Sequence, residues 1–446
     1  MKLSRKLWRY QIPRMHTCLT ITGMMCCLLY YARYDHLLEA FVGCHRFCRE
    51  LKLHPPRSAA RCAHFDMRDI ELTDGFPRRV ITSTTQGEIP GEDEESTAGD
   101  ACGLSVVYRA SAWEREWRDN IQERQSDDIF WARGCAAMRQ ALDKTEHWLN
   151  YYQSRRVGGL NPKLDPWNED VFSYHEYSDT CTKRVLAKVP LEPLVGTLRH
   201  PYAVCDANEF KCDSNMIICR VRKFFVGSSK RKGPSPTLLS KEYMLPLLRA
   251  EFMAGHNLSH APANKPRTFF FDLGASTYKD GGGGPSLSWF IETYRESGLQ
   301  FRRVIGWEAK ELKPAKIFEG MPNDLMTSIS YFNIPVEDAK GGKNNPWRYV
   351  RDLVQPEDFV VVKVDIDTPK IEAELMRQLI MNDDKALDDD GVKLCELIDE
   401  LYFEHHVWGS GLSPTWAGNG MDGDMVGSYT LFAQLRNLGI RAHSWV

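Results

Sequence analysis

An alternation of apolar runs and amphipathic segments across residues 268–446 is the strongest constraint on the fold. Four runs have the length of strands, and the segments between them repeat apolar residues at helical spacing. Alternating strands and helices build a parallel sheet. The gapless run Phe359-Val360-Val361-Val362 indicates burial on both faces, which is typical of a doubly wound, mostly parallel α/β sheet. The predicted strands are residues 268–273, 303–307, 359–366 and 400–403, and the predicted helices are residues 286–297, 346–353 and 370–380.

The N-terminal segment has the charge pattern of a signal anchor. Residues 1–14 carry five basic residues and no acidic residue, and an uncharged run follows at residues 15–32. A helix of this length is just long enough to cross the ~30 Å apolar core of a bilayer. Basic residues stay in the cytosol, so we expect a cytosolic tail at residues 1–14 and a membrane anchor at residues 15–34. The chain would then be a single-pass type II protein facing the Golgi or endoplasmic reticulum lumen, with a buried or organelle-targeting helix as the alternative.

The region after the anchor is predicted to be a disordered stem. The stem is assigned to residues 35–126, of which residues 53–126 are rich in Pro, Arg, Thr and Gly and include an acidic stretch at residues 88–100 without a basic residue. Order is expected to begin near Asp127, with one helix over residues 127–152.

A cysteine-rich subdomain is predicted between the stem and the α/β domain. Residues 127–235 are broken by prolines, contain a plausible strand at 216–226, and are expected to be an irregular α+β unit, followed by a Rossmann-like domain at residues 236–446. Ten of the 13 cysteines lie beyond the anchor, which predicts disulfides in an oxidising lumen. Five of them cluster in this region: Cys135, Cys181, Cys205, Cys212 and Cys219.

The overall charge excludes two classes of protein. The chain has 57 Lys and Arg against 60 Asp and Glu, for a formal net charge of −3, and it has no long basic stripe. Because binding to a phosphate backbone depends on many Lys and Arg contacts, nucleic acid is not expected as a partner. A mean hydropathy of −0.42 excludes a protein with several membrane spans. The sequence leaves the oligomeric state open.

A turn of small residues follows the first predicted strand of the α/β domain. Residues 269–276 read Phe-Phe-Phe-Asp-Leu-Gly-Ala-Ser, and four glycines follow at residues 281–284. At the carboxyl end of a parallel strand, such a turn lets backbone N–H groups and a helix N-terminus approach a nucleotide-type ligand. Glu308 ends the next strand, 36 residues after Asp272, where an acid can accept both hydroxyls of a ribose. The dinucleotide fingerprint G-x-G-x-x-G is absent.

Each predicted strand of this region is associated with a short motif. In chain order the motifs are Asp272-x-Gly274-Ala275, Trp307-Glu308, Val362-Lys363-Val364-Asp365-Ile366-Asp367 and Tyr402-Phe403-Glu404-His405-His406. With these motifs, residues 268–446 resemble the FkbM-type branch of S-adenosylmethionine-dependent methyltransferases. The family pattern reads approximately D-V-G-A-N-x-G in the first loop and K-I-D-V-E-G-x-E on the fourth strand. This chain has Ser276 for the Asn, Tyr278 for the second Gly, and Asp367-Thr368-Pro369 for Glu-Gly.

The resemblance implies transfer of a methyl group from S-adenosylmethionine to a hydroxyl of a glycan or another small molecule. It implies that Glu308, beside Trp307, holds the ribose of the cofactor. The residues implied at the methionine end are Asp272, Gly274, Ala275 and Ser276, and those implied on the acceptor side are Lys363, Asp365, Asp367, His405 and His406.

Transfer to a hydroxyl needs a base, and a His or Asp with a pKa near neutrality suits that role. We assign the base to His405 or His406. Successive residues on a strand point to opposite faces, so only one of the two histidines can share the pocket, whereas Asp365 and Asp367 are expected to share a face.

Three alternatives use the same residues. Asp365-x-Asp367 resembles the metal-binding motif of glycosyltransferases, in which two carboxylates hold Mn²⁺ or Mg²⁺, and a histidine could complete the shell. A metal-assisted methyltransferase could use the same carboxylates and a histidine. A non-catalytic, membrane-tethered binding module would have its pocket filled by side chains, with Tyr278 and Trp307 as the expected fillers.

Overall fold

The computed structural model describes residues 104–121, 127–158, 167–206, 236–248, 266–279, 286–381, 392–409, 412, 416 and 420–445. The predicted anchor at residues 15–34, the predicted strand at 216–226 and the glycine run at 281–284 lie outside the described residues. Within the described ranges, no helix combines the length and the apolar composition needed to cross a bilayer.

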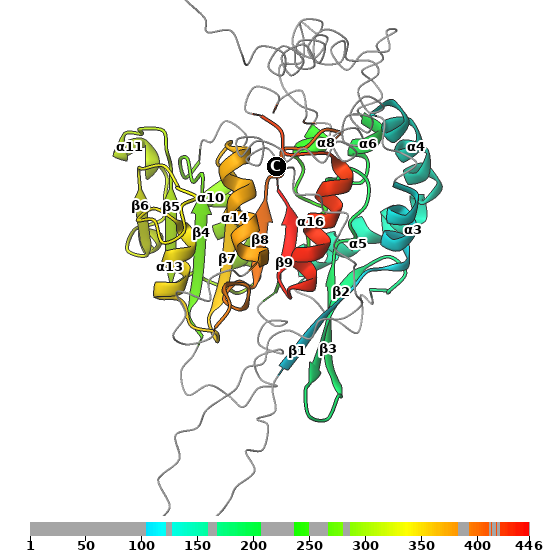
Figure 1. Cartoon of the computed structure of the whole chain (residues 1–446), viewed down its shortest axis with the longest axis horizontal. Helices are drawn as coiled ribbons and strands as arrows, with labels where there is room; N and C mark the ends of the chain where they lie inside the picture. Colours follow the sequence, from blue (N-terminus) through cyan, green and yellow to red (C-terminus); the bar gives the residue numbers. More distant parts are fainter. Residues whose placement is uncertain are drawn as a thin grey trace, which may run out of the picture. The chain divides into compact units, whose positions relative to one another are not determined.

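Six strands form the central sheet of this part of the chain, as expected for an α/β fold (Figure 1). Their order is β6-β5-β4-β7-β8-β9, and every neighbouring pair is parallel. Counted along the chain this is 3-2-1-4-5-6, the doubly wound order in which ligands bind at the carboxyl ends of the two central strands. Those strands are β4 and β7. The strands are β4 (Thr268–Leu273), β5 (Arg303–Trp307), β6 (Ile329–Phe332), β7 (Phe359–Val364), β8 (Glu400–Phe403) and β9 (Arg441–Ser444).

The apolar runs predicted four of these six strands. β4, β5 and β8 have the predicted bounds, and β7 ends at Val364, two residues before its predicted end. The sequence missed β6 and β9. β6 is an edge strand of four half-buried residues, and β9 reads Arg-Ala-His-Ser, so neither strand has an apolar run. β9 is nevertheless fully buried.

Helices cover both faces of the sheet. Phe270 of β4 packs on Phe290 of α10, with ring centroids 4.6 Å apart. On the opposite face, Phe403 of β8 packs on Phe432 of α16 at 6.2 Å. The helical elements of this region are α10 (Ser286–Glu296), α11 (Pro314–Ile317), α12 (Asn323–Met326), α13 (Pro346–Leu353), α14 (Pro369–Met381), the 3-10 turn η6 (Leu394–Glu396) and α16 (Met425–Asn437).

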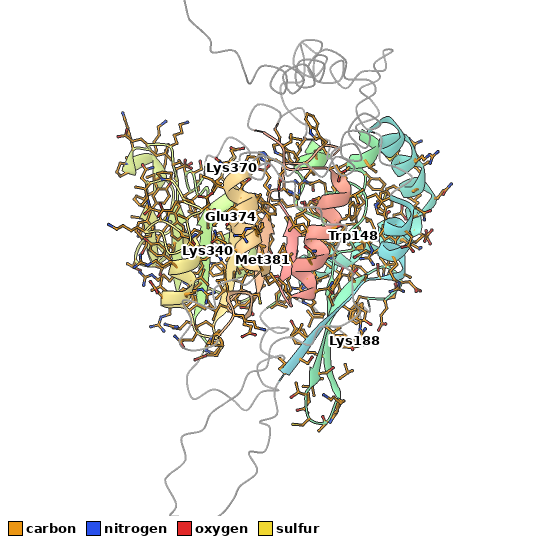
Figure 2. The ribbon with its side chains drawn as sticks, viewed as in Figure 1. Trp148, Lys188, Lys340, Lys370, Glu374 and Met381 are labelled. Carbon is orange, nitrogen blue, oxygen red and sulfur yellow. A yellow bond between two sulfur atoms is a disulfide. The ribbon has the colours of Figure 1, made fainter. Side chains whose placement is uncertain are left out.

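Three of these helices match the predicted ones within one residue at each end: α10, α13 and α14. In α14 the buried Leu375 and Leu379 lie on the inner side, while Lys370 and Met381 are exposed on the outer side (Figure 2). The helical spacing of apolar residues therefore located both the helix and its buried side.

The described residues before position 249 form an accessory segment. Its elements are β1 (Leu104–Arg109), α3 (Ala112–Ile121), α4 (Asp127–Gln140), α5 (Leu142–Gly158), β2 (Ser173–Asp179), β3 (Val185–Leu191), α6 (Ala203–Asp206) and α8 (Pro236–Leu239). β1, β2 and β3 form an antiparallel sheet in that order. A disulfide between Cys135 and Cys205 joins α4 to α6, as the cysteine cluster predicts.

Two predictions for this segment are wrong. The stem was expected to reach residue 126, but residues 104–121 form β1 and α3, so order begins before Asp127. The reason is that Trp113 and Trp117 are buried one turn apart and anchor α3 despite its charged surroundings. The single helix predicted over residues 127–152 is two helices that meet at Ala141.

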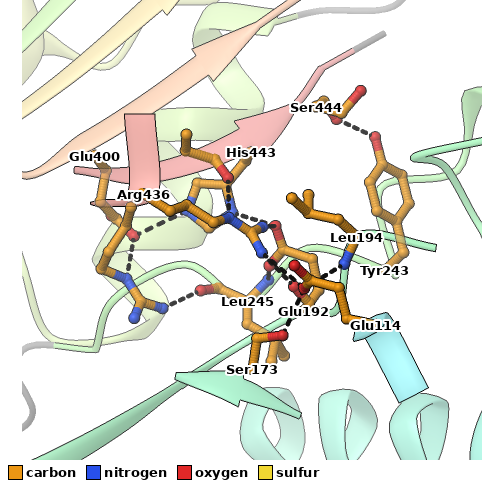
Figure 3. A network of polar contacts seen from close by, with 12 residues as sticks. Glu114, Ser173, Glu192, Leu194, Tyr243, Leu245, Glu400, Arg436, His443 and Ser444 are labelled. Atoms are coloured by element: carbon orange, nitrogen blue, oxygen red, sulfur yellow. Dashed lines mark hydrogen bonds and ion pairs between the residues drawn. The ribbon is translucent and has the colours of Figure 1, made fainter. Parts of the chain in front are cut away.

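A buried network of charged residues joins the accessory segment to β8, β9 and α16 (Figure 3). Glu192, which follows β3, accepts from Arg436 Nη2 at 2.8 Å and lies 2.8 Å from His443 Nδ1. Although burial disfavours the carboxylate, the charges of His443 and Arg436 lower the pKa of Glu192 to about 2. Glu192 is therefore an anion held between two elements of the α/β domain.

Glu400 extends the network along β8. Its Oε1 atom lies 3.3 Å from His443 Nε2, and it accepts from Arg441 Nε at 3.2 Å and from Leu247 N–H at 2.7 Å. Arg441 also donates to Leu245 O at 2.6 Å. The accessory segment thus contacts this face of β9, and Glu400 of β8, through polar groups. The neighbouring α10 also packs here, because Tyr294 donates to Glu400 and Phe290 packs on Tyr402 of β8.

Replacing Arg436 with Met should reduce the free energy of unfolding by about 3–5 kcal/mol, because it removes one partner of a buried ion pair. Equilibrium unfolding in urea measures the change. The control is Arg348→Met, which removes an exposed pair with Asp352 at 3.6 Å and should cost about 0–1 kcal/mol. Equal losses in the two variants would contradict a structural role for the network.

Candidate functional site

The loops after β4 and β7 touch at the carboxyl edge of the sheet. Gly274 has a φ of +88°, and a Cβ at this position would lie 1.7 Å from Asp365 O. Only glycine fits there, because the backbone conformation and the lack of space both exclude a side chain. The Asp365 N–H donates to Leu273 O at 3.1 Å, so the pairing of the two strands continues into the loops.

The N–H groups of the small-residue turn bond within the protein. Gly274 and Ala275 both donate to Trp307 O at 2.9 Å, and Ser276 N–H donates to Glu308 Oε2 at 3.0 Å. This differs from the expected cradle, because these N–H groups already have partners. The same contacts place the Glu308 carboxylate directly beside the turn, where the sequence predicted the acid of the site.

Lys363 links the turn to the loop after β7. Its Nζ atom lies 3.2 Å from Asp272 Oδ1, 3.1 Å from Asp365 Oδ2 and 2.9 Å from Gly274 O. Burial disfavours the ammonium, but the two carboxylates outweigh it and raise the pKa of Lys363. Burial also raises the pKa of Asp272. Lys363, which the resemblance placed on the acceptor side, is therefore a fixed cation that holds two strands together.

Glu404, which follows β8, continues this line of polar contacts. It hydrogen-bonds to Asp365, and its Oε2 atom lies 3.1 Å from His406 Nε2. Burial, with repulsion from Asp365, raises the pKa of Glu404 to about 7. For His406, the hydrogen bond and charge of Glu404 outweigh burial and raise the pKa of the ring. The polar contacts thus run without a break from Asp272 to His406 across the ends of three strands.

The predicted metal pair of Asp365 and Asp367 is replaced by a different group. One ligand atom from each of Asp367, Glu404 and His406 lies within 4.8 Å of the other two. Asp365 is not in this group, because its carboxylate contacts Lys363. β7 ends at Val364 and Asp367 has a φ of +53°, so the strand alternation that put residues 365 and 367 on one face does not continue to them.

Three predicted residues lie apart from this line. His405 Nδ1 lies 3.0 Å from Ser428 Oγ of α16, whereas His406 Nε2 contacts Glu404, so only His406 joins this line; both histidines lie beyond the end of β8 at Phe403. The Trp307 ring is fully buried against Phe332 and Tyr349. Tyr278 is 2% exposed. Both aromatic side chains are therefore buried.

Three further residues reach the site without a local sequence signal. Trp445, after β9, donates from Nε1 to Asp365 Oδ2 at 3.1 Å. Lys241 Nζ lies 4.6 Å from the centroid of the Trp445 ring, and burial, with repulsion from Arg199, lowers the pKa of Lys241 to about 8. Lys241 and Arg199 come from the accessory segment, so only the tertiary fold reveals them. Glu404, by contrast, could have been identified from the sequence, because it directly follows the strand predicted at residues 400–403.

Comparison with family models, with curated proteins and with solved structures gave no match to this chain.

Changing Gly274 to Ala should destabilise the protein far more than the same change at Gly341. Both glycines have positive φ, at +88° and +68°, but a Cβ at Gly341 would meet nothing within 4 Å. Gly341→Ala should therefore cost only the backbone strain, about 1–2 kcal/mol. Gly274→Ala adds a clash with the backbone of the β7 loop. Urea unfolding of both variants measures the difference, and equal losses would show that the two loops are not in contact.

The buried Glu372 gives a prediction on pH. Its Oε1 atom accepts from Ile366 N–H at 2.8 Å, and burial raises its pKa from an ordinary 4.5 to about 8. The proton is bound more tightly in the folded state, so its contribution to stability is complete below about pH 4.5 and is lost as the pH rises to about 8. Glu372→Gln should remove this loss. The stability difference between variant and parent should therefore grow with pH from 5 to 8, whereas the exposed Glu311→Gln should give a constant difference in urea unfolding.

Proposed function

We propose that this chain is an S-adenosylmethionine-dependent O-methyltransferase that acts on a hydroxyl of a glycan or another small molecule. The observation that carries the proposal is the contact between Ser276 N–H and Glu308 Oε2 at 3.0 Å. It brings the Asp272-x-Gly274 turn and the acid 36 residues later to one place at the central strands of the sheet. The resemblance places these two features together, and their contact is what supports the proposal.

The donor set at this place fits the cofactor. Asp272 Oδ2 is buried and has no hydrogen-bond partner among the described residues, and a cofactor ammonium group would supply one. Glu308 is half-buried and accepts from Ser276 and Lys310 N–H groups; a carboxylate has further acceptor capacity for ribose hydroxyls. When bound, S-adenosylmethionine supplies an electrophilic methyl group.

His406 is the histidine that would activate the acceptor. The hydroxyl proton of the acceptor would pass to His406 Nδ1, the ring nitrogen that has no hydrogen-bond partner among the described residues, as the methyl group supplied by the bound cofactor replaces this proton on oxygen and the cofactor leaves as a thioether. The contact of the other ring nitrogen, Nε2, with Glu404 would stabilise the protonated ring. Lys363 would position Asp272 rather than take part in the transfer.

The glycosyltransferase alternative receives less support. It needs both carboxylates of Asp365-x-Asp367 on one metal ion, and Asp365 contacts Lys363 and Trp445 instead. The disulfide of the accessory segment favours an oxidising compartment, in line with an anchored protein facing the Golgi or endoplasmic reticulum lumen.

Calorimetric titration of the full chain with S-adenosylmethionine tests the proposal. We expect saturable binding that weakens by about tenfold or more, 1.4 kcal/mol, in Asp272→Asn and in Glu308→Gln. The matched control is Glu311→Gln, an exposed residue three positions after Glu308, which should bind normally.

A parallel titration with UDP- and GDP-sugars in the presence of Mn²⁺ separates the alternatives. Sugar-nucleotide binding that is lost in Asp365→Asn, without binding of S-adenosylmethionine, would overturn the proposal in favour of a glycosyltransferase. No binding of any of these ligands by folded protein would favour the non-catalytic module.

A further inference from the structure

Asp367, Glu404 and His406 have the separations of ligands around one ion. His406 Nε2 lies 3.1 Å from Glu404 Oε2 and 3.8 Å from Asp367 Oδ1, and all three ligand atoms lie within 4.8 Å of one another. Ligands at about 2.1 Å from an ion are about 3.0 Å apart when at right angles and about 4.2 Å apart when opposite. Small side-chain adjustments would therefore bring all three atoms onto one centre.

The two buried ligands are already oriented. The indole of Trp416 stacks on the His406 ring, with centroids 4.7 Å apart and planes 16° apart. The same indole donates from Nε1 to Glu404 Oε1 at 3.0 Å, which leaves Oε2 facing the histidine. Outer contacts of this kind fix ligand orientation at metal sites. One side chain thus holds two ligands with their donor atoms directed toward each other.

The group formed by Asp367, Glu404 and His406 is buried on one side and faces solvent on the other. The side chains of His406 and Glu404 are 0% and 10% exposed, whereas that of Asp367 is 65% exposed. An ion bound here would have protein on one side and free coordination positions on the other. Two carboxylates and one imidazole suit a divalent first-row ion such as Mn²⁺, which accepts both oxygen and nitrogen ligands.

We propose that Asp367, Glu404 and His406 bind a divalent metal ion of the Mn²⁺ type. The site is distinct from the Asp365-x-Asp367 pair, because Glu404 and His406 replace Asp365. Metal binding does not depend on the methyltransferase proposal, and it uses the Nε2 atom that otherwise hydrogen-bonds to Glu404. With an ion bound, His406 is a ligand, and activation of an acceptor hydroxyl falls to the ion.

Titration of the metal-stripped full chain with Mn²⁺, followed by the electron paramagnetic resonance signal of the free ion, tests the site. We expect one site per chain, with binding weakened about tenfold or more in Glu404→Gln and in His406→Gln. The matched control is His405→Gln, which changes the neighbouring histidine on the side of α16 and should leave the affinity unchanged. Mn²⁺ should also raise the unfolding temperature of the parent protein but not that of His406→Gln.

A third variant, Asp367→Asn, tests the site at its exposed ligand, so the test does not depend on the folding of Glu404→Gln and His406→Gln. Asp367 is exposed and has positive φ, a conformation that Asn adopts readily, so the variant should fold and still bind Mn²⁺ about tenfold more weakly. Unchanged affinity in folded Asp367→Asn and His406→Gln would overturn the proposal, as would the absence of a saturable site in the parent. Because the readout is the metal alone, failure here leaves the cofactor titration unaffected.

Discussion

The buried charge network around Glu192 and Glu400 is the interaction on which the arrangement of the described residues depends. One face of β9 is covered by the accessory segment around Glu192 and Leu245, and the strand contacts it with Arg441 and His443 rather than with apolar side chains. Burying such charges is unfavourable unless each has partners. Here the partners come from both parts of the chain, so the accessory segment and the sheet stabilise each other. The same packing brings Lys241 beside the site.

The sequence predicted the strands whose stability comes from apolar burial and missed those whose burial depends on distant partners. β4 and β7 are buried on both faces, so their residues form gapless apolar runs. The polar residues of β9 are buried because Glu192, more than 200 positions earlier, compensates His443, and local patterns contain no such information. α3 was missed for a related reason, since two buried tryptophans within a charged stretch outweigh its composition.

Predictions for the candidate site also succeeded where strand positions were sufficient and failed where three-dimensional contacts decide. The turn at Gly274 and the acid at Glu308 were found because adjacent parallel strands end at one edge, a rule that needs only strand positions. The pairing of Asp365 with Asp367 failed because it extended strand alternation past Val364, where the strand ends. Lys363 appeared as a residue for chemistry, but its three contacts make it a structural cation. Residue types thus located the candidate site. Only the three-dimensional contacts distinguish its structural residues from its candidate ligand-binding residues.

The balance of charge at the carboxyl edge connects the two proposed ligands. The turn N–H groups are directed at Trp307 and Glu308, so they do not make an anion site of the kind common at strand ends. The remaining charged groups at this edge are carboxylates: Asp272, one oxygen of which has no partner among the described residues, the half-buried Glu308 and the exposed Asp367. Carboxylates in a partly buried site favour positively charged partners. An ammonium or sulfonium group beside Asp272 and a divalent ion beside Asp367 would both meet that requirement, at opposite ends of one line of polar contacts.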